Sequence, residues 1–142
     1  MNIYADSSFF VSPYVQDSHK AEFLKRIAAH PALWLTPLHK AEVANAIYLH
    51  VFHKSLKPVA AANAWSEFQQ DLRAGVWIVV DLPSTAFERC ADLARLYSAT
   101  LGVRTLDSLH VGCALELRAD KFWTFDERQA KLAKAVGLDT AA

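Results

Sequence analysis

The 142-residue sequence has little of several features that mark particular classes of protein. It contains four glycines and five prolines, too few for the many turns of a β-sandwich. Its two cysteines, Cys90 and Cys113, form no Cys-x-x-Cys motif and lie in apolar, helix-like stretches. We therefore interpret them as small buried thiols rather than as a disulfide or a pair of metal ligands, which suits a reducing cytoplasm.

An excess of charge and a long apolar run are also missing. Fifteen Lys and Arg side chains balance fifteen Asp and Glu side chains, so the chain lacks a net basic surface that would capture nucleic acid nonspecifically. The longest apolar run, residues 76–80, is far too short to span a bilayer. No basic segment followed by a long apolar stretch marks a signal peptide, so we expect a cytoplasmic protein with no membrane contact.

Hydrophobic residues make up 53% of the chain, enough to bury the core of a single domain over residues 1–142. Short apolar stretches predict strands at residues 2–5, 33–36, 76–80 and 122–125. Capping residues, Pro and Gly predict helices directly after Asp6 and over residues 17–30, 37–53, 58–75, 83–101, 105–118 and 127–136. Thr36 and Thr105 are among the predicted N-caps. Because the strands are too far apart for hairpins, we expect an α/β fold with a mostly parallel four- to five-stranded sheet flanked by helices.

Four acidic residues stand where an apolar stretch meets a polar one: Asp6, Glu42, Asp107 and Asp126. Asp6 and Asp126 follow predicted strands, and functional groups gather beyond the carboxyl ends of parallel strands. Asp107 lies in the first turn of one predicted helix, and Glu42 shares a face with apolar residues of another. A carboxylate near a core needs a positive or hydrogen-bonding partner, and a hard cation such as Mg²⁺ is the simplest partner that all four could share.

Each acid also has an ordinary structural explanation. Asp6 and Asp126 suit the N-cap position of a helix, and Asp107 suits the positive end of a helix dipole. Glu42 is equally explained by an ion pair with Lys40 or with a distant arginine. These patterns alone leave the metal site and the structural roles as open alternatives.

Two basic residues lie near Asp107 in the sequence. Arg104 has two equally good explanations, a contact with phosphate or a structural pair with one of the acids. His110 lies next to the helix face of Asp107, where a role in helix packing or in supporting a metal ligand is favoured over that of a general base.

Four short motifs occur in a fixed order: Asp6-Ser7-Ser8, Glu42-Val-Ala-Asn45, Arg104-Thr-Leu-Asp107-Ser-Leu-His110 and Thr124-Phe-Asp126. With these motifs, the chain resembles a PIN-domain ribonuclease, in particular the VapC-like toxins of type II toxin–antitoxin pairs. The resemblance covers essentially the whole chain and implies one PIN domain with a Rossmann-like sheet. The tail from Gly137 is short for the final edge strand of such proteins, which leaves a fifth strand open.

The resemblance implies a metal-dependent endoribonuclease that uses Mg²⁺ or Mn²⁺ and leaves 5′-phosphate and 3′-hydroxyl ends on RNA. It implies that the catalytic and metal-binding residues are Asp6, Glu42, Asp107 and Asp126. Residues with supporting or substrate-contacting roles would be Ser8, Asn45, Arg104 and Thr124. Our hypothesis is that Asp6 and Asp107 hold the principal metal, while Glu42 and Asp126 complete the site or position the attacking water.

The resemblance also implies an RNA substrate, a cognate antitoxin protein that blocks the acidic pocket, and a homodimer. A non-catalytic PIN-like module that binds RNA or protein is the alternative, although the presence of all four acids does not indicate lost catalysis. A phosphatase with Asp6 as its nucleophile is disfavoured, because Ser8 stands where such enzymes often carry a second aspartate.

Overall fold

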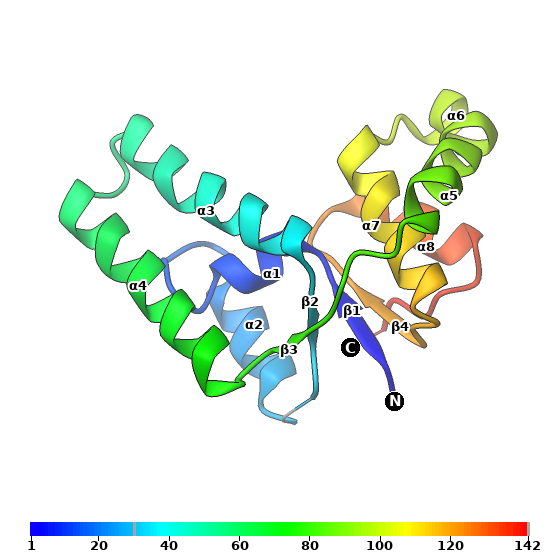
Figure 1. Ribbon diagram of the computed structural model, residues 1–142. Helices are drawn as coiled ribbons and strands as arrows, with labels where there is room; N and C mark the ends of the chain where they lie inside the picture. The colour runs from blue at the N-terminus through cyan, green and yellow to red at the C-terminus, as the bar shows by residue number, and fades with distance from the viewer. Residues whose placement is uncertain (30, 142) are drawn as a thin grey trace. The chain divides into compact units, whose positions relative to one another are not determined.

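The computed structural model describes residues 1–29 and 31–141 of the chain (Figure 1). The chain divides into two compact units. Unit 1 comprises residues 1–6 and 81–142, and unit 2 comprises residues 7–80. The N-terminal strand therefore belongs to the same unit as the C-terminal half of the chain.

Unit 1 is built around two parallel strands, β1 (Ile3–Ala5) and β4 (Lys121–Trp123), which lie side by side in Figure 1. The ring of Tyr4 on β1 stacks on Phe122 of β4, with centroids 5.6 Å apart and both side chains fully buried. The helical segments of this unit are α5 (Thr85–Leu93), a π-helical turn η1 (Ala94–Ser98), α6 (Ala99–Leu101), α7 (Thr105–Glu116) and α8 (Glu127–Ala135). Helices α7 and α8 pack on each other, and α8 also contacts β4.

Helix α7 packs closely on α5 because one of its residues has no side chain. A Cβ atom at Gly112 would lie 3.1 Å from the carbonyl oxygen of Ala86 and 3.4 Å from the backbone nitrogen of Cys90. The middle of α7, from Ser108 to Ala114, is buried. The glycine therefore sets how near the backbones of α5 and α7 can come.

Unit 2 contains a second parallel pair, β2 (Trp34–Leu35) and β3 (Ile78–Val79). Its helices are α1 (Ser7–Val11), α2 (Lys20–Ile27), α3 (Pro37–Phe52) and α4 (Pro58–Ala74). Helix α3 begins as its sequence predicts: the Thr36 side chain accepts from the backbone N–H of His39, and Pro37 occupies the first turn. Helix α4 ends at Gly75, whose φ of 74° is left-handed.

In unit 2 a half-buried series of hydrogen bonds lies beside the aromatic rings of the core. The indole Nε1 of Trp77 donates to the hydroxyl of Tyr14 at 2.9 Å, and that hydroxyl donates to Asp71 Oδ2 at 2.6 Å. Burial and the neighbouring Asp71 carboxylate raise the pKa of Tyr14 well above its usual value. Next to these hydrogen bonds, the ring of Phe10 packs edge-on against Trp77, and the ring of Phe68 packs edge-on against Tyr14.

The predicted fold class, an α/β fold with parallel strands flanked by helices, is confirmed. In the described residues the strands pair in twos, and the tail adds a single parallel bridge between Asp139 and Lys121 rather than a fifth strand. No helix within this part of the chain is long and apolar enough to cross a membrane.

Several predicted boundaries change. The helix expected over residues 17–30 covers Lys20–Ile27, and its predicted end at residue 30 lies outside the described residues. The strand expected over residues 76–80 narrows to Ile78–Val79, and the helix expected over residues 83–101 is interrupted by the π-helical turn. Thr105 does not cap α7 as predicted: Arg104 takes the extended N-cap conformation and Thr105 is the first helical residue.

Candidate functional site

Three of the four predicted acids lie in unit 1, at the ends of elements that contact one another. Asp6 directly follows β1, and its backbone N–H donates to the carbonyl oxygen of Trp123 at 2.8 Å. Asp126 follows β4 and caps α8, accepting the backbone N–H of Gln129 at 2.9 Å. Asp107 lies in the first turn of α7, so the predicted positions at strand ends and a helix start are found.

Gln129 links the segments that carry these three acids, and its side chain is fully buried. Its Nε2 lies 3.3 Å from Asp6 Oδ1 and 3.3 Å from the backbone carbonyl oxygen of Asp107. Its Oε1 accepts from the hydroxyl of Thr124 at 2.5 Å. One side chain thus contacts the end of β1, the start of α7 and the turn before α8.

Arg104 faces the same group of acids from the solvent side. Its Nε lies 3.1 Å from Asp107 Oδ2, and the side chains are 77% and 15% exposed, respectively. The hydrogen bond to Asp107 raises the pKa of Arg104, and the charges of Asp126 and Asp6 act in the same direction. All three acids therefore contribute negative potential at one guanidinium. The structural pair with an acid, one of the two explanations for Arg104, is present.

His110 lies on the buried face of α7, close to Asp6. Its ring is 1% exposed, with Nδ1 2.8 Å from the hydroxyl of Tyr4 and Nε2 3.7 Å from Asp6 Oδ1. Burial raises the pKa of the Cys113 thiol, one helical turn further along, to about 11. His110 is packed and hydrogen-bonded, as its favoured role predicts.

The fourth acid, Glu42, lies in unit 2 on α3. Its Oε1 accepts a hydrogen bond from the hydroxyl of Ser7 at 2.8 Å, and Ser7 is the residue that follows Asp6 in the chain. Among the other predicted residues, Asn45 is exposed on α3 and Ser8 is half-buried in α1. Glu42 thus has a specific partner in the first of the four motifs.

The ligand chemistry of unit 1 fits a hard divalent cation, because its acids offer carboxylate oxygens and Asp6 and Asp107 are 17% and 15% exposed. One oxygen of each acid already accepts from the protein: Asp6 from Gln129, Asp107 from Arg104 and Asp126 from the start of α8. Across residues 1–29 and 31–141, no group of three or more His, Cys, Asp or Glu side chains has the spacing to hold a metal ion. Mg²⁺ is commonly bound in proteins by one or two carboxylates and keeps several water ligands.

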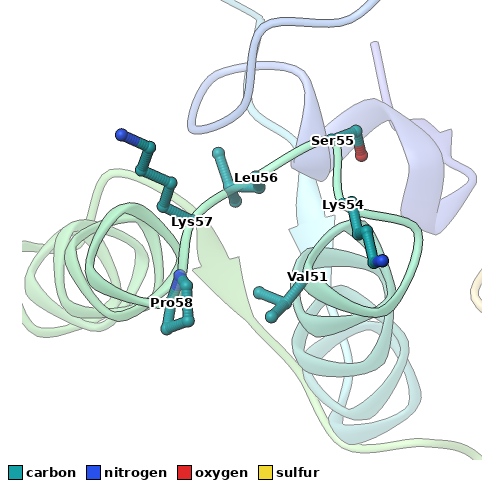
Figure 2. A pocket seen from close by; sticks show the side chains of 6 residues that line it. All are labelled: Val51, Lys54, Ser55, Leu56, Lys57 and Pro58. Atoms are coloured by element: carbon teal, nitrogen blue, oxygen red, sulfur yellow. The ribbon is translucent and has the colours of Figure 1, made fainter.

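A surface pocket in unit 2 has a lining unlike that of the acidic site. It lies in unit 2 where α3 turns into α4, has a volume of about 510 Å³, and is lined by Val51, Lys54, Ser55, Leu56, Lys57 and Pro58 (Figure 2). None of the predicted site residues lines it. Its lining carries no acid, so its chemistry differs from that of the acid-bearing strand ends.

Two outcomes follow for the sequence-based interpretation. The N-cap explanation of Asp126 is correct as a structural role, and the charge of its carboxylate also acts on Arg104. Gln129 was missed, although Asp-Glu-Arg-Gln has the spacing of a capping motif in which an N-cap acid is followed three residues later by Gln. The side chain of Gln129 instead turns towards Thr124, Asp6 and the start of α7.

Comparisons with known proteins bear on the family and the fold of the chain. The family model described as the PIN domain matches residues 3–135. Among solved structures, VapC20 of Mycobacterium tuberculosis, a sarcin–ricin loop cleaving toxin, has a TM-score of 0.69 at 15% identity, covering 98% of both chains. FitAcB of Neisseria gonorrhoeae has a TM-score of 0.68 at 13% identity, covering 99% of this chain and 96% of its own.

VapBC2 of Rickettsia felis, in a structure bound to a DNA fragment from its promoter, has a TM-score of 0.61 at 14% identity and covers 99% of this chain and 98% of its own. A search of curated protein sequences finds no match. At these identities the solved structures share the fold.

Proposed function

Because the chain belongs to the PIN-domain family, we propose that it is a metal-dependent endoribonuclease and the toxin of a toxin–antitoxin pair. The observation that carries this proposal is the grouping of Asp6, Asp107 and Asp126 at the ends of β1 and β4 and the start of α7. All three act on one guanidinium, which indicates a shared negative potential. The similarity in fold to VapC20, a sarcin–ricin loop cleaving toxin, supports the same proposal.

In the proposed reaction the acids bind Mg²⁺ or Mn²⁺, which would lower the pKa of a bound water and stabilise charge on the phosphate. Asp6 and Asp107 are the proposed principal ligands, and Asp126 is proposed to orient water from its position at the start of α8. Glu42 is proposed as the fourth acid from its place in the family motif and from its bond to Ser7. The exposed guanidinium of Arg104 is suited to a backbone phosphate of the RNA.

The proposal extends to the organisation of the protein. The matched family model covers parts of both units, which supports a single PIN domain over residues 1–142. The partners would be RNA, a cognate antitoxin and a second copy of the chain, in the cytoplasm. Buried, unpaired thiols at Cys90 and Cys113 suit that reducing compartment.

The direct test is to incubate the purified protein with total cellular RNA and Mg²⁺ or Mn²⁺ and to map new 5′-phosphate ends. Cleavage at defined positions that stops in EDTA and in the Asp107→Asn variant is the expected result. Binding of RNA without any cleavage at saturating metal would favour the alternative, a non-catalytic module. A protein encoded by a short reading frame immediately upstream should bind the chain and suppress cleavage.

A further inference from the structure

Gln129 has an unusual position for a neutral polar residue. Its side chain is fully buried, yet its amide contacts two segments that carry proposed metal ligands, at Asp6 Oδ1 and at the carbonyl of Asp107. Its backbone N–H also holds the carboxylate of Asp126. A single residue therefore contacts each of the three proposed site acids of unit 1, through a side-chain oxygen of Asp6 and of Asp126 and through the backbone carbonyl of Asp107.

The hydrogen bonds fix which way the amide points. The Thr124 hydroxyl accepts the backbone N–H of Asp126 at 3.0 Å, so its own proton is free to be donated to Gln129 Oε1. The carboxylate of Asp6 and the carbonyl of Asp107 are acceptors, and they require the NH₂ side of the amide. A flipped amide would place its oxygen against two other oxygens, so only one orientation satisfies all the contacts.

From this geometry we propose that Gln129 is a positioning residue for the metal site, a role that rests on the function proposed above. Its amide fixes the orientation of the Asp6 carboxylate relative to the first turn of α7, where Asp107 lies. A neutral donor can do this without cancelling the charge of the carboxylate. A lysine or arginine in the same place would instead compete with a divalent cation.

The Gln129→Met variant tests this role, because Met has a similar length and volume but no donor. The matched control is Gln70→Met, which makes the same change at an exposed position of α4. Mn²⁺ binding is measured by calorimetry on each protein without RNA. Loss of a partner that orients a metal ligand typically weakens metal affinity by roughly 10–100-fold, and we expect a weakening in that range for Gln129→Met alone.

Two results would overturn the proposal in distinguishable ways. If Gln129→Met is less stable without metal but binds Mn²⁺ as tightly as the parent protein, Gln129 has a structural role only. If the parent protein itself binds no Mn²⁺, both the proposed metal site and the proposed positioning role of Gln129 are wrong.

A second measurement needs no variant and so does not depend on Gln129→Met folding. The side-chain amide protons of Gln129 should give two resolved nuclear magnetic resonance signals that shift when Mg²⁺ is added, while those of Gln70 should not. Signals of Gln129 that remain in place at saturating Mg²⁺ would contradict the role.

Discussion

The two units of the protein differ in what their internal hydrogen-bond networks touch. In unit 2, two successive hydrogen bonds join Trp77 to Tyr14 and Tyr14 to Asp71, so these side chains pair with one another. In unit 1 the Gln129 amide also pairs internally, but it touches Asp6, whose carboxylate stays partly open to solvent. The network of unit 2 is therefore suited to stabilising the fold, whereas the network of unit 1 is suited to holding ligands for a cation.

The largest expected effect comes from unit 1, where Asp107→Asn keeps the side-chain shape but removes the charge. We expect RNA cleavage to fall by more than the roughly 10–100-fold that loss of a supporting partner costs. The exposed ion pair with Arg104 contributes only about 0–1 kcal/mol, so thermal stability should change little. Cleavage assays and thermal melts on the same preparation measure both. A variant that melts much earlier would show that Asp107 serves stability first.

The reverse pattern is expected in unit 2 for Tyr14→Phe. The change leaves Trp77 Nε1 and Asp71 without their shared hydroxyl, and a buried group without its partner costs about 1–3 kcal/mol. Urea unfolding should show this loss, while cleavage per folded molecule stays at the parent value. Tyr48→Phe, at an exposed position of the same unit, is the matched control and should leave stability unchanged. Equal losses in both variants would contradict a special role for the Tyr14 hydroxyl.

Alkaline pH should reveal the contribution of one buried thiol of unit 1 to stability. The pKa of Cys113 in unit 1 is raised from 9.0 to about 11, mainly by burial, so the folded state favours the protonated thiol. A raised folded-state pKa gives stability that is complete below about pH 9 and is lost as pH rises towards 11. Urea midpoints between pH 8 and 11 should fall less steeply for Cys113→Ala than for the parent. Parallel slopes would show that the thiol does not contribute.

The smallest effect is expected at Arg104, whose guanidinium is mostly exposed. Arg104→Met should weaken RNA binding. It should also reduce the slope of log binding constant against log salt concentration by about the contribution of one phosphate contact. Arg95→Met is the control, because Arg95 forms a similar ion pair three residues from its partner, Asp92, at 3.1 Å. Filter binding at several salt concentrations compares the two. The same slope in both variants would leave Arg104 with its structural pair only.

Much of the fold could be predicted because local chemistry decides it. Thr36 and Pro37 start α3, and Gly75 and Gly102 end helices in the left-handed conformation that glycine adopts readily. Thr105 misled the prediction: Asp107 turns back to Arg104, 3.4 Å from its backbone N–H and 3.1 Å from its side chain, and the cap moves one residue earlier. Capping motifs thus located helices well but not always their first residue.

The acids of the site were predictable in part, because Asp6 and Asp126 follow short apolar strands and Asp107 begins a helix. The residues that orient them were not. Gln129 and Asp6 are 123 positions apart, and no local pattern reports that their side chains meet. The Trp77–Tyr14 bond, across 63 positions, was unpredictable for the same reason.

The close approach of α5 and α7 at Gly112 has a consequence for how the protein could be tuned. Gly112 is five residues from Asp107 along one rigid helix, a rise of about 7.5 Å at ~1.5 Å per residue. A methyl group there would press on the backbone of α5 at Ala86, and α7 would have to shift by a few tenths of an ångström. That shift would be transmitted along the helix to its first turn, so Gly112 indirectly sets the position of the Asp107 carboxylate.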